Sequence, residues 1–78
     1  MTPDVVTQYM IFRRIKDLGK SQKWGVLNKS ANSILGRIEW YAQWRQYVFQ
    51  PYPYTEFNCE CLDTISDFLK RLNRDAQQ

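Results

Sequence analysis

The run ILGRIEWYAQWRQYVFQ, residues 34–50, decides the fold of this 78-residue chain. Its two halves, 34–41 and 45–50, are rich in the β-branched and aromatic residues that strands favour. Only the segment 42–44 separates them, and a connection this short is typical of an antiparallel hairpin. The run therefore predicts two neighbouring strands joined by a three-residue turn.

Two further segments upstream have strand-like composition. Residues 23–28 read as another strand, whereas residues 9–15 fit two interpretations. They could pair with 23–28 through a turn at 17–20, or they could form a helix that begins near Pro3. The turn-like residues and the Ile, Phe and Tyr content favour the strand, and the choice stays open.

The C-terminal segment 59–73 predicts an amphipathic helix. Asn58 is a suitable N-cap, acidic residues lie near the start, and basic residues lie near the end. The apolar side chains recur at three- and four-residue steps and form one stripe, made of Cys61, Leu62, Ile65, Phe68, Leu69 and Leu72. The preceding residues 51–55, which include two prolines, are expected to be an extended strap.

These elements predict a single α+β domain spanning residues 1–78. We expect an antiparallel β-meander packed under one C-terminal helix at 59–73, because one helix can cover one face of such a sheet. The three to four expected strands are at about 9–15, 23–28, 34–41 and 45–50. If 9–15 is helical instead, the order becomes α-β-β-β-α.

Alternation along the strands divides the side chains between two sheet faces. The more apolar face should lie under the helix, and it should carry Trp24, Val26, Ile38, Trp40 and Val48. The other face should combine rings with arginines. The candidate binding residues, which include Trp44 from the turn, are Arg37, Tyr41, Trp44, Arg45, Tyr47 and Phe49.

Rings beside arginines suit three different roles. Tyr, Trp and Arg are common hot-spot residues of protein interfaces. Aromatic rings also stack on the bases of single-stranded nucleic acid while cations attract its phosphates. Residues 13–45 are strongly basic and residues 56–75 mildly acidic, which makes the molecule dipolar. The third role is burial of the rings within a homodimer.

The composition argues against catalysis and against a bound cofactor or metal. The chain has no histidine, and its only two thiols are those of Cys59 and Cys61. A zinc site would need ligands from a second chain, and a weak metal-dependent nuclease would have to be built across a dimer. Glu39 is expected to pair with Arg37. No signal peptide or membrane span is recognisable, so reduced thiols and a cytoplasmic location are expected.

One pattern within residues 35–69 resembles a family of very small phage and prophage proteins of unassigned function. The pattern is Leu-Gly-x-Ile-x-Trp-Tyr, Trp-Arg-x-Tyr-x-Phe-x-Pro, then Phe and Cys-Leu-x-x-Ile-x-x-Phe. The matching positions are Leu35, Gly36, Ile38, Trp40, Tyr41, Trp44, Arg45, Tyr47, Phe49, Pro51, Phe57, Cys61, Leu62, Ile65 and Phe68.

The resemblance implies a phage or mobile-element origin but no particular chemistry. Small phage accessory proteins often block host defence by binding a host molecule, which favours a non-enzymatic role against a host protein in the bacterial cytoplasm. The alternative is a dimeric single-stranded nucleic-acid-binding protein. A meander followed by one helix is similar in topology to the coactivator and whirly group of single-stranded DNA binders, which is an analogy of fold alone.

Overall fold

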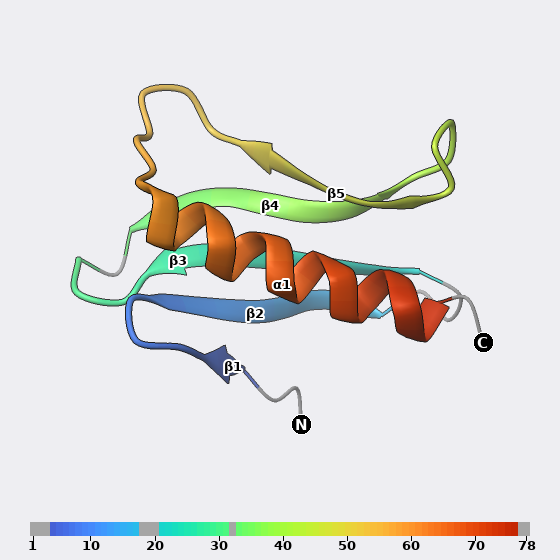
Figure 1. Ribbon diagram of the computed structural model, residues 1–78, viewed down its shortest axis with the longest axis horizontal. Helices are drawn as coiled ribbons and strands as arrows, with labels where there is room; N and C mark the ends of the chain where they lie inside the picture. The colour runs from blue at the N-terminus through green and yellow to red at the C-terminus, as the bar shows by residue number, and fades with distance from the viewer. Residues whose placement is uncertain (1–3, 18–20, 32, 77–78) are drawn as a thin grey trace.

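A five-stranded antiparallel sheet and one long helix make up the fold. The computed structural model describes residues 4–17, 21–31 and 33–76. The elements are β1 (Val5–Val6), β2 (Met10–Asp17), β3 (Gln22–Asn28), β4 (Ile34–Tyr41), β5 (Gln46–Pro51) and α1 (Cys59–Ala76). Each strand pairs with the next along the chain, in the order β1-β2-β3-β4-β5 (Figure 1).

The predicted α+β meander with a C-terminal helix is confirmed, including the favoured strand at 9–15, and two details differ. Residues 10–15 of that segment belong to β2, whose pairing with β3 excludes the helical alternative. The short strand β1, which was not predicted, pairs with β2 at the edge of the sheet. The helix continues to Ala76, three residues beyond the predicted end. The turn expected at 17–20 lies, apart from Asp17, outside the described residues.

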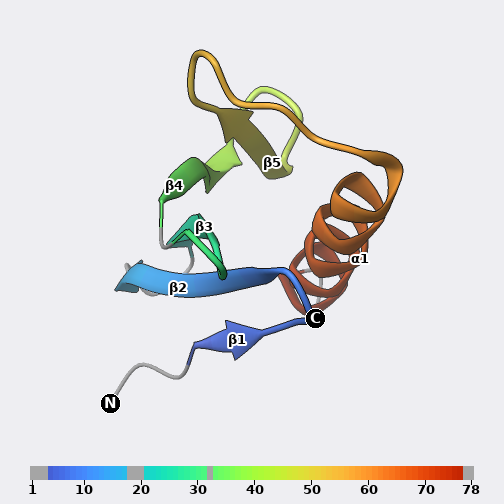
Figure 2. The same ribbon diagram turned by 90° about the vertical axis from the view of Figure 1, so that its left-hand side faces the viewer.

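The helix α1 lies against one face of the sheet and leaves the other face uncovered (Figure 2). Asn58 caps the helix as predicted, since its side-chain oxygen accepts a hydrogen bond from the amide of Cys61 at 2.8 Å. Ile65 and Phe68 are the buried residues of the helix, whereas Leu62 of the predicted stripe is half exposed.

The core lies between this helix and the covered face of the sheet. Phe68 stacks on Phe12 of β2 with ring centroids 4.2 Å apart and meets Trp24 of β3 edge-on at 4.9 Å. Stacked and edge-on ring pairs contribute about 0.5–1.5 kcal/mol beyond their buried area. The full set of buried apolar side chains is Met10, Phe12, Trp24, Val26, Ile38, Tyr47, Ile65 and Phe68.

A glycine lets the ring of Phe49 lie against the backbone of β4. A Cβ atom on Gly36 would lie 2.6 Å from the carbonyl oxygen of Gln50 and 2.7 Å from the ring of Phe49. The Phe49 ring meets Phe57 edge-on, with centroids 5.4 Å apart, and this contact ties β5 to the segment that leads into the helix.

The connection from β5 to the helix is a turn, so the expected extended strap at 51–55 is wrong. Tyr54 has a positive φ of 63°, and the hydroxyl of Thr55 donates to the carbonyl of Tyr52 at 2.7 Å. The prolines do disfavour helix, but they also permit a turn, and the side-chain hydrogen bond stabilises it. The ring of Tyr54 is fully exposed.

Candidate functional site: an aromatic turn and an open sheet face

The β4–β5 turn is one residue longer than predicted, and this changes the candidate site. Residues 42–45 form the turn, in which the amides of Trp44 and Arg45 donate to the carbonyls of Tyr41 and Ala42 at 3.2 and 3.3 Å. Arg45 adopts a positive φ of 54°. It is therefore part of the turn, and β5 begins at Gln46 rather than at 45.

A shift of one residue moves every side chain of a strand to the opposite face. Ile38 pairs with Phe49, and Trp40 pairs with Tyr47, so these four side chains share the face that the helix covers. The prediction that Tyr47 and Phe49 lie on the open face is therefore wrong. Val48, predicted to be in the core, pairs with Glu39 and lies on the open face instead.

Tyr47 is a structural residue of the core. Its side chain is only 5% exposed, and its hydroxyl accepts a hydrogen bond from the amide of Gln22 at 3.0 Å. The backbone of Tyr47 also bonds to Asn73 of the helix: its amide donates to the Asn73 side-chain oxygen at 2.6 Å, and its carbonyl accepts at 3.4 Å. Tyr47 thus fixes the C-terminal half of the helix on the sheet, and a partner cannot reach it.

The remaining rings of the predicted site, Tyr41 and Trp44, lie at the β4–β5 turn with Arg45. Trp40, which was predicted to be in the core, is partly exposed at the same end, and we call these four residues the aromatic turn. The side chain of Trp44 is 65% exposed and that of Trp40 is 37% exposed. Trp44 packs edge-on against Tyr41 with centroids 5.1 Å apart, and Trp40 packs edge-on against Tyr47 at 5.3 Å. The hydroxyl of Tyr41 donates to the side chain of Gln43.

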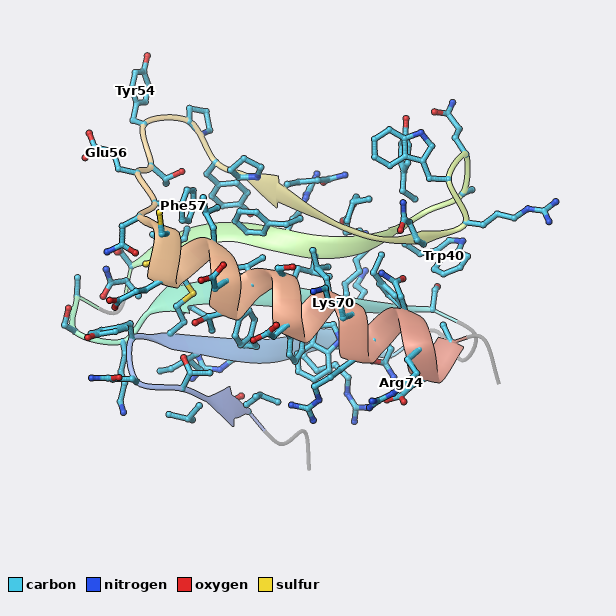
Figure 3. The ribbon with its side chains drawn as sticks, in the orientation of Figure 1. Trp40, Tyr54, Glu56, Phe57, Lys70 and Arg74 are labelled. Atoms are coloured by element: carbon cyan, nitrogen blue, oxygen red, sulfur yellow. The ribbon has the colours of Figure 1, made fainter. Side chains whose placement is uncertain are left out.

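The aromatic turn lies at one end of the molecule. In Figure 3, Trp40 lies near the C-terminal end of α1, where Arg74 is also labelled, whereas Tyr54, Glu56 and Phe57 lie at the opposite end. Ring-to-ring contacts on both sides of the turn reduce the freedom of the two tryptophans. The turn therefore presents large, partly fixed rings and one exposed guanidinium to solvent.

The open face of the sheet carries an aliphatic row that was not predicted. The pairs Val6–Ile11, Ile11–Leu27 and Leu27–Ile34 are opposite each other in the sheet, so these four side chains cross four strands at one level. A β-bulge in β4 sets this arrangement, because it brings Ile34 to the open face and turns Leu35 toward the core. Strict alternation with Gly36 and Ile38 would place Ile34 on the covered face.

Ion pairs lie on the open face of the sheet, next to the aliphatic row. Arg13 bonds to Asp4 at 3.1 Å, and the hydrogen bond and charge of Asp4 raise the pKa of Arg13. Glu39 lies 3.3 Å from Lys23 and 3.5 Å from Arg37, so the predicted pairing of Glu39 with Arg37 is confirmed. Arg37 also donates to the side chain of Gln50 at 3.0 Å.

A signal for the aliphatic row was present in β2. Ile11 and Ile15 alternate with Met10 and Phe12, so this strand is apolar on both faces. A strand that is buried on one face only normally alternates apolar with polar residues. The pattern in β2 therefore departs from that of a strand with one buried and one solvent-facing side.

A separate pocket of about 610 Å³ lies at the other end of the molecule, beside the start of the helix. Its lining combines apolar side chains such as Met10 and Leu35 with the carboxylates of Glu56 and Glu60. Cys61 also lines it, and both cysteines are free thiols. Within the described residues, no three side chains of the kinds that bind metals come together.

The geometry defines a small sheet-and-helix domain with two exposed surfaces, the aromatic turn and the open face. The comparison with curated proteins gives a relative: the chain is 32% identical to the "Uncharacterized 9.3 kDa protein" of Acholeplasma phage L2. The similarity extends over 73 residues, which is 92% of this chain and 94% of the phage protein. The chain therefore belongs to the same family as this small phage protein.

Other comparisons give no match. No protein-family model matches the chain, and no solved structure matches it. Among the described residues, no helix is both long enough and apolar enough to cross a membrane.

Proposed function

We propose that this chain is a non-enzymatic phage or prophage protein that binds a host protein through its aromatic turn and thereby modulates or inhibits it. The observation that carries the proposal is the exposure of Trp44 at 65%, together with the exposed Arg45 in the same turn and Trp40, 37% exposed, near the end of β4. The relationship to a phage protein supports the phage context. The target would be a factor in the cytoplasm of the bacterial host, such as a component of host defence.

Large exposed rings are costly in a small domain unless a partner covers them. Trp and Arg are the residue types that most often dominate binding energy at protein interfaces, where removing a single anchor costs 2 kcal/mol or more. The edge-on contacts of Trp40 and Trp44 hold the rings before a partner arrives, which lowers the entropy cost of binding. The two tryptophans and Arg45 are therefore suited to be the anchors.

Single-stranded nucleic acid is the second candidate partner. The open face carries the cations Arg13, Lys16, Lys23 and Arg37 against the carboxylates Asp4 and Glu39, which favours phosphate binding. Base stacking also needs rings. Because Tyr47 and Phe49 lie on the covered face, Tyr41 is the ring that remains on the open one. This geometry favours the protein partner over the nucleic acid.

A matched pair of substitutions tests the proposal. Trp44→Ala combined with Arg45→Ala should abolish recovery of the host partner from lysate, since two anchors are lost. Tyr54→Ala is the control, because Tyr54 is an even more exposed ring at the opposite end of the molecule. Equal recovery by the wild-type and doubly substituted chains would refute the role of the aromatic turn.

Fluorescence anisotropy with labelled single-stranded oligonucleotides separates the second candidate. At about 50 mM salt phosphate-driven binding is strong, and it weakens steeply as salt rises. We expect no salt-sensitive binding in this range. Tight binding that falls with salt, together with no recovered host protein, would favour nucleic acid as the partner.

A further inference from the structure

The open face of the sheet has the chemistry of a buried surface. Val6, Ile15 and Ile34 are each roughly half exposed there, and Ile11 and Leu27 lie between them. Contiguous aliphatic side chains on an uncovered sheet face indicate that another surface covers them. Aliphatic residues do not stack on bases, so the natural partner of this row is another apolar protein surface.

We infer that a second copy of this chain covers the open face, so that two sheets pack face to face in a two-fold homodimer. This inference is independent of the aromatic turn and of the partner proposed for it. Three observations support the second copy as the occupant: the symmetry of the aliphatic row, the area of the face, and the internal pairing of its charges.

The register of the sheet makes the row self-complementary. Ile11 in β2 and Ile34 in β4 lie on either side of Leu27 in the central strand β3, at the same level. A two-fold axis that runs parallel to the strands over β3 places β2 of one copy opposite β4 of the other. Ile11 then faces Ile34 of the second copy, and Leu27 faces its own equivalent.

The area of the face is close to the lower limit for a specific interface. Its strands hold 2, 8, 7, 8 and 6 residues, and each residue covers ~16 Å² at a strand spacing of ~4.8 Å and a rise of ~3.3 Å. The projected area is therefore ~490 Å² per copy, or ~980 Å² in total, and specific protein interfaces bury about 1,200 Å² or more. Side chains that interdigitate between the sheets bury more than this projection.

The charges beside the row are already paired within each chain. The same two-fold axis brings Arg13 of one copy opposite Arg37 of the other, and these side chains bond to Asp4 and Glu39 of their own chains. Between them lies Gly25, and the side chain of Ile15 reaches over it, so apolar atoms separate the two arginine positions of each face. The residual repulsion between two net-positive faces is screened by salt, so dimerisation should strengthen as salt rises.

Analytical ultracentrifugation of the full chain tests this inference. At about 100 μM, where even a dimer of micromolar affinity is populated, the wild type should sediment at twice its monomer mass of 9.4 kDa. Ile34→Lys should raise the dissociation constant about 100-fold or more. The matched control is Leu62→Lys, because Leu62 is an equally exposed aliphatic residue on the helix, and it should leave the dimer unchanged.

A crosslinking experiment keeps the test decisive if Ile34→Lys does not fold. With Cys59 and Cys61 replaced by serine, Leu27→Cys should form a covalent dimer with a short bis-maleimide, and Leu62→Cys should not. A wild-type chain that stays monomeric at this concentration overturns the inference. Crosslinking through position 62 but not through position 27 overturns it as well, because it would place the interface on the helix side.

Discussion

The substitution Tyr47→Phe tests the division of the sheet into a covered and an open face. In the structure the Tyr47 hydroxyl accepts a hydrogen bond from the amide of Gln22 at 3.0 Å, within a largely buried site. Phenylalanine keeps the ring but leaves this amide without its acceptor. Loss of one partner of a buried hydrogen bond costs about 1–3 kcal/mol.

The expected change in thermal stability follows from the size of the domain. One kcal/mol shifts the melting temperature of a 60–100-residue domain by about 4–8 °C, so the substitution should lower it by at least about 4 °C. Circular dichroism melts measure the shift, and all variants are compared at one protein concentration because the proposed dimerisation would also raise the melting temperature.

Tyr54→Phe is the control for this measurement. Its hydroxyl belongs to a fully exposed ring, so the melting temperature should not change measurably. If Tyr47 were on the open face, as strand alternation across a three-residue turn suggests, Tyr47→Phe would be equally neutral. A melting temperature within about 1 °C of wild type would therefore refute the register described above, since surface substitutions usually stay within about 0.5 kcal/mol.

Four further substitutions have expected outcomes in the same melts. Gly36→Ala should destabilise the fold by about 1–3 kcal/mol, because the new Cβ would lie 2.6 Å from backbone. Gly25→Ala should cost less, because its Cβ would meet only a flexible side chain, at 3.3 Å. Equal losses of stability in the two variants would contradict this packing. Asn58→Ala should cost about 1 kcal/mol through loss of the N-cap, with lower helix content as an accompanying readout, and no change would mean that the cap is unimportant. Asn73→Ala should cost about 1–3 kcal/mol, because the backbone amide of Tyr47 in β5 loses its hydrogen-bond acceptor. Hydrogen exchange at that amide should accelerate. An unchanged exchange rate would contradict the contact.

Local chemistry was enough to predict most of the fold. The helix, its Asn58 cap and the strands of the meander follow from side-chain periodicity and from the composition of each segment. The segment 9–15 was ambiguous because its apolar residues fit both a helix and a strand. Cross-strand hydrogen bonds to β3 decide in favour of the strand, and a single segment carries no signal for such long-range pairing.

The candidate site was predicted only in part, because the β4–β5 turn is one residue longer than predicted. The sequence places rings and arginines near the hairpin, but the length of the turn decides which rings are exposed. Arg45 adopts a left-handed conformation that is uncommon for a residue other than glycine, asparagine or aspartate. Nothing in the residue type announces this conformation, so Tyr47 and Phe49 were assigned to the wrong face.

The bulge in β4 had a similar effect on the aliphatic row. Strict alternation places Ile34 with Gly36 and Ile38, whereas the bulge moves it to the other face and brings Leu35 inward. Bulges insert an extra residue on one strand and invert the alternation beyond it. The row across β1 to β4 therefore emerged only from the paired strands.

Site-specific photo-crosslinking in the bacterial host tests whether the aromatic turn contacts a host protein. A photoreactive phenylalanine analogue replaces Trp44 in one variant and Tyr54 in the other, which compares exposed rings at opposite ends of the molecule. We expect a discrete adduct with a host protein from position 44 and none from position 54. Adducts from position 54 alone, or no protein adduct from position 44 in a folded chain, would contradict a partner-binding role for the aromatic turn.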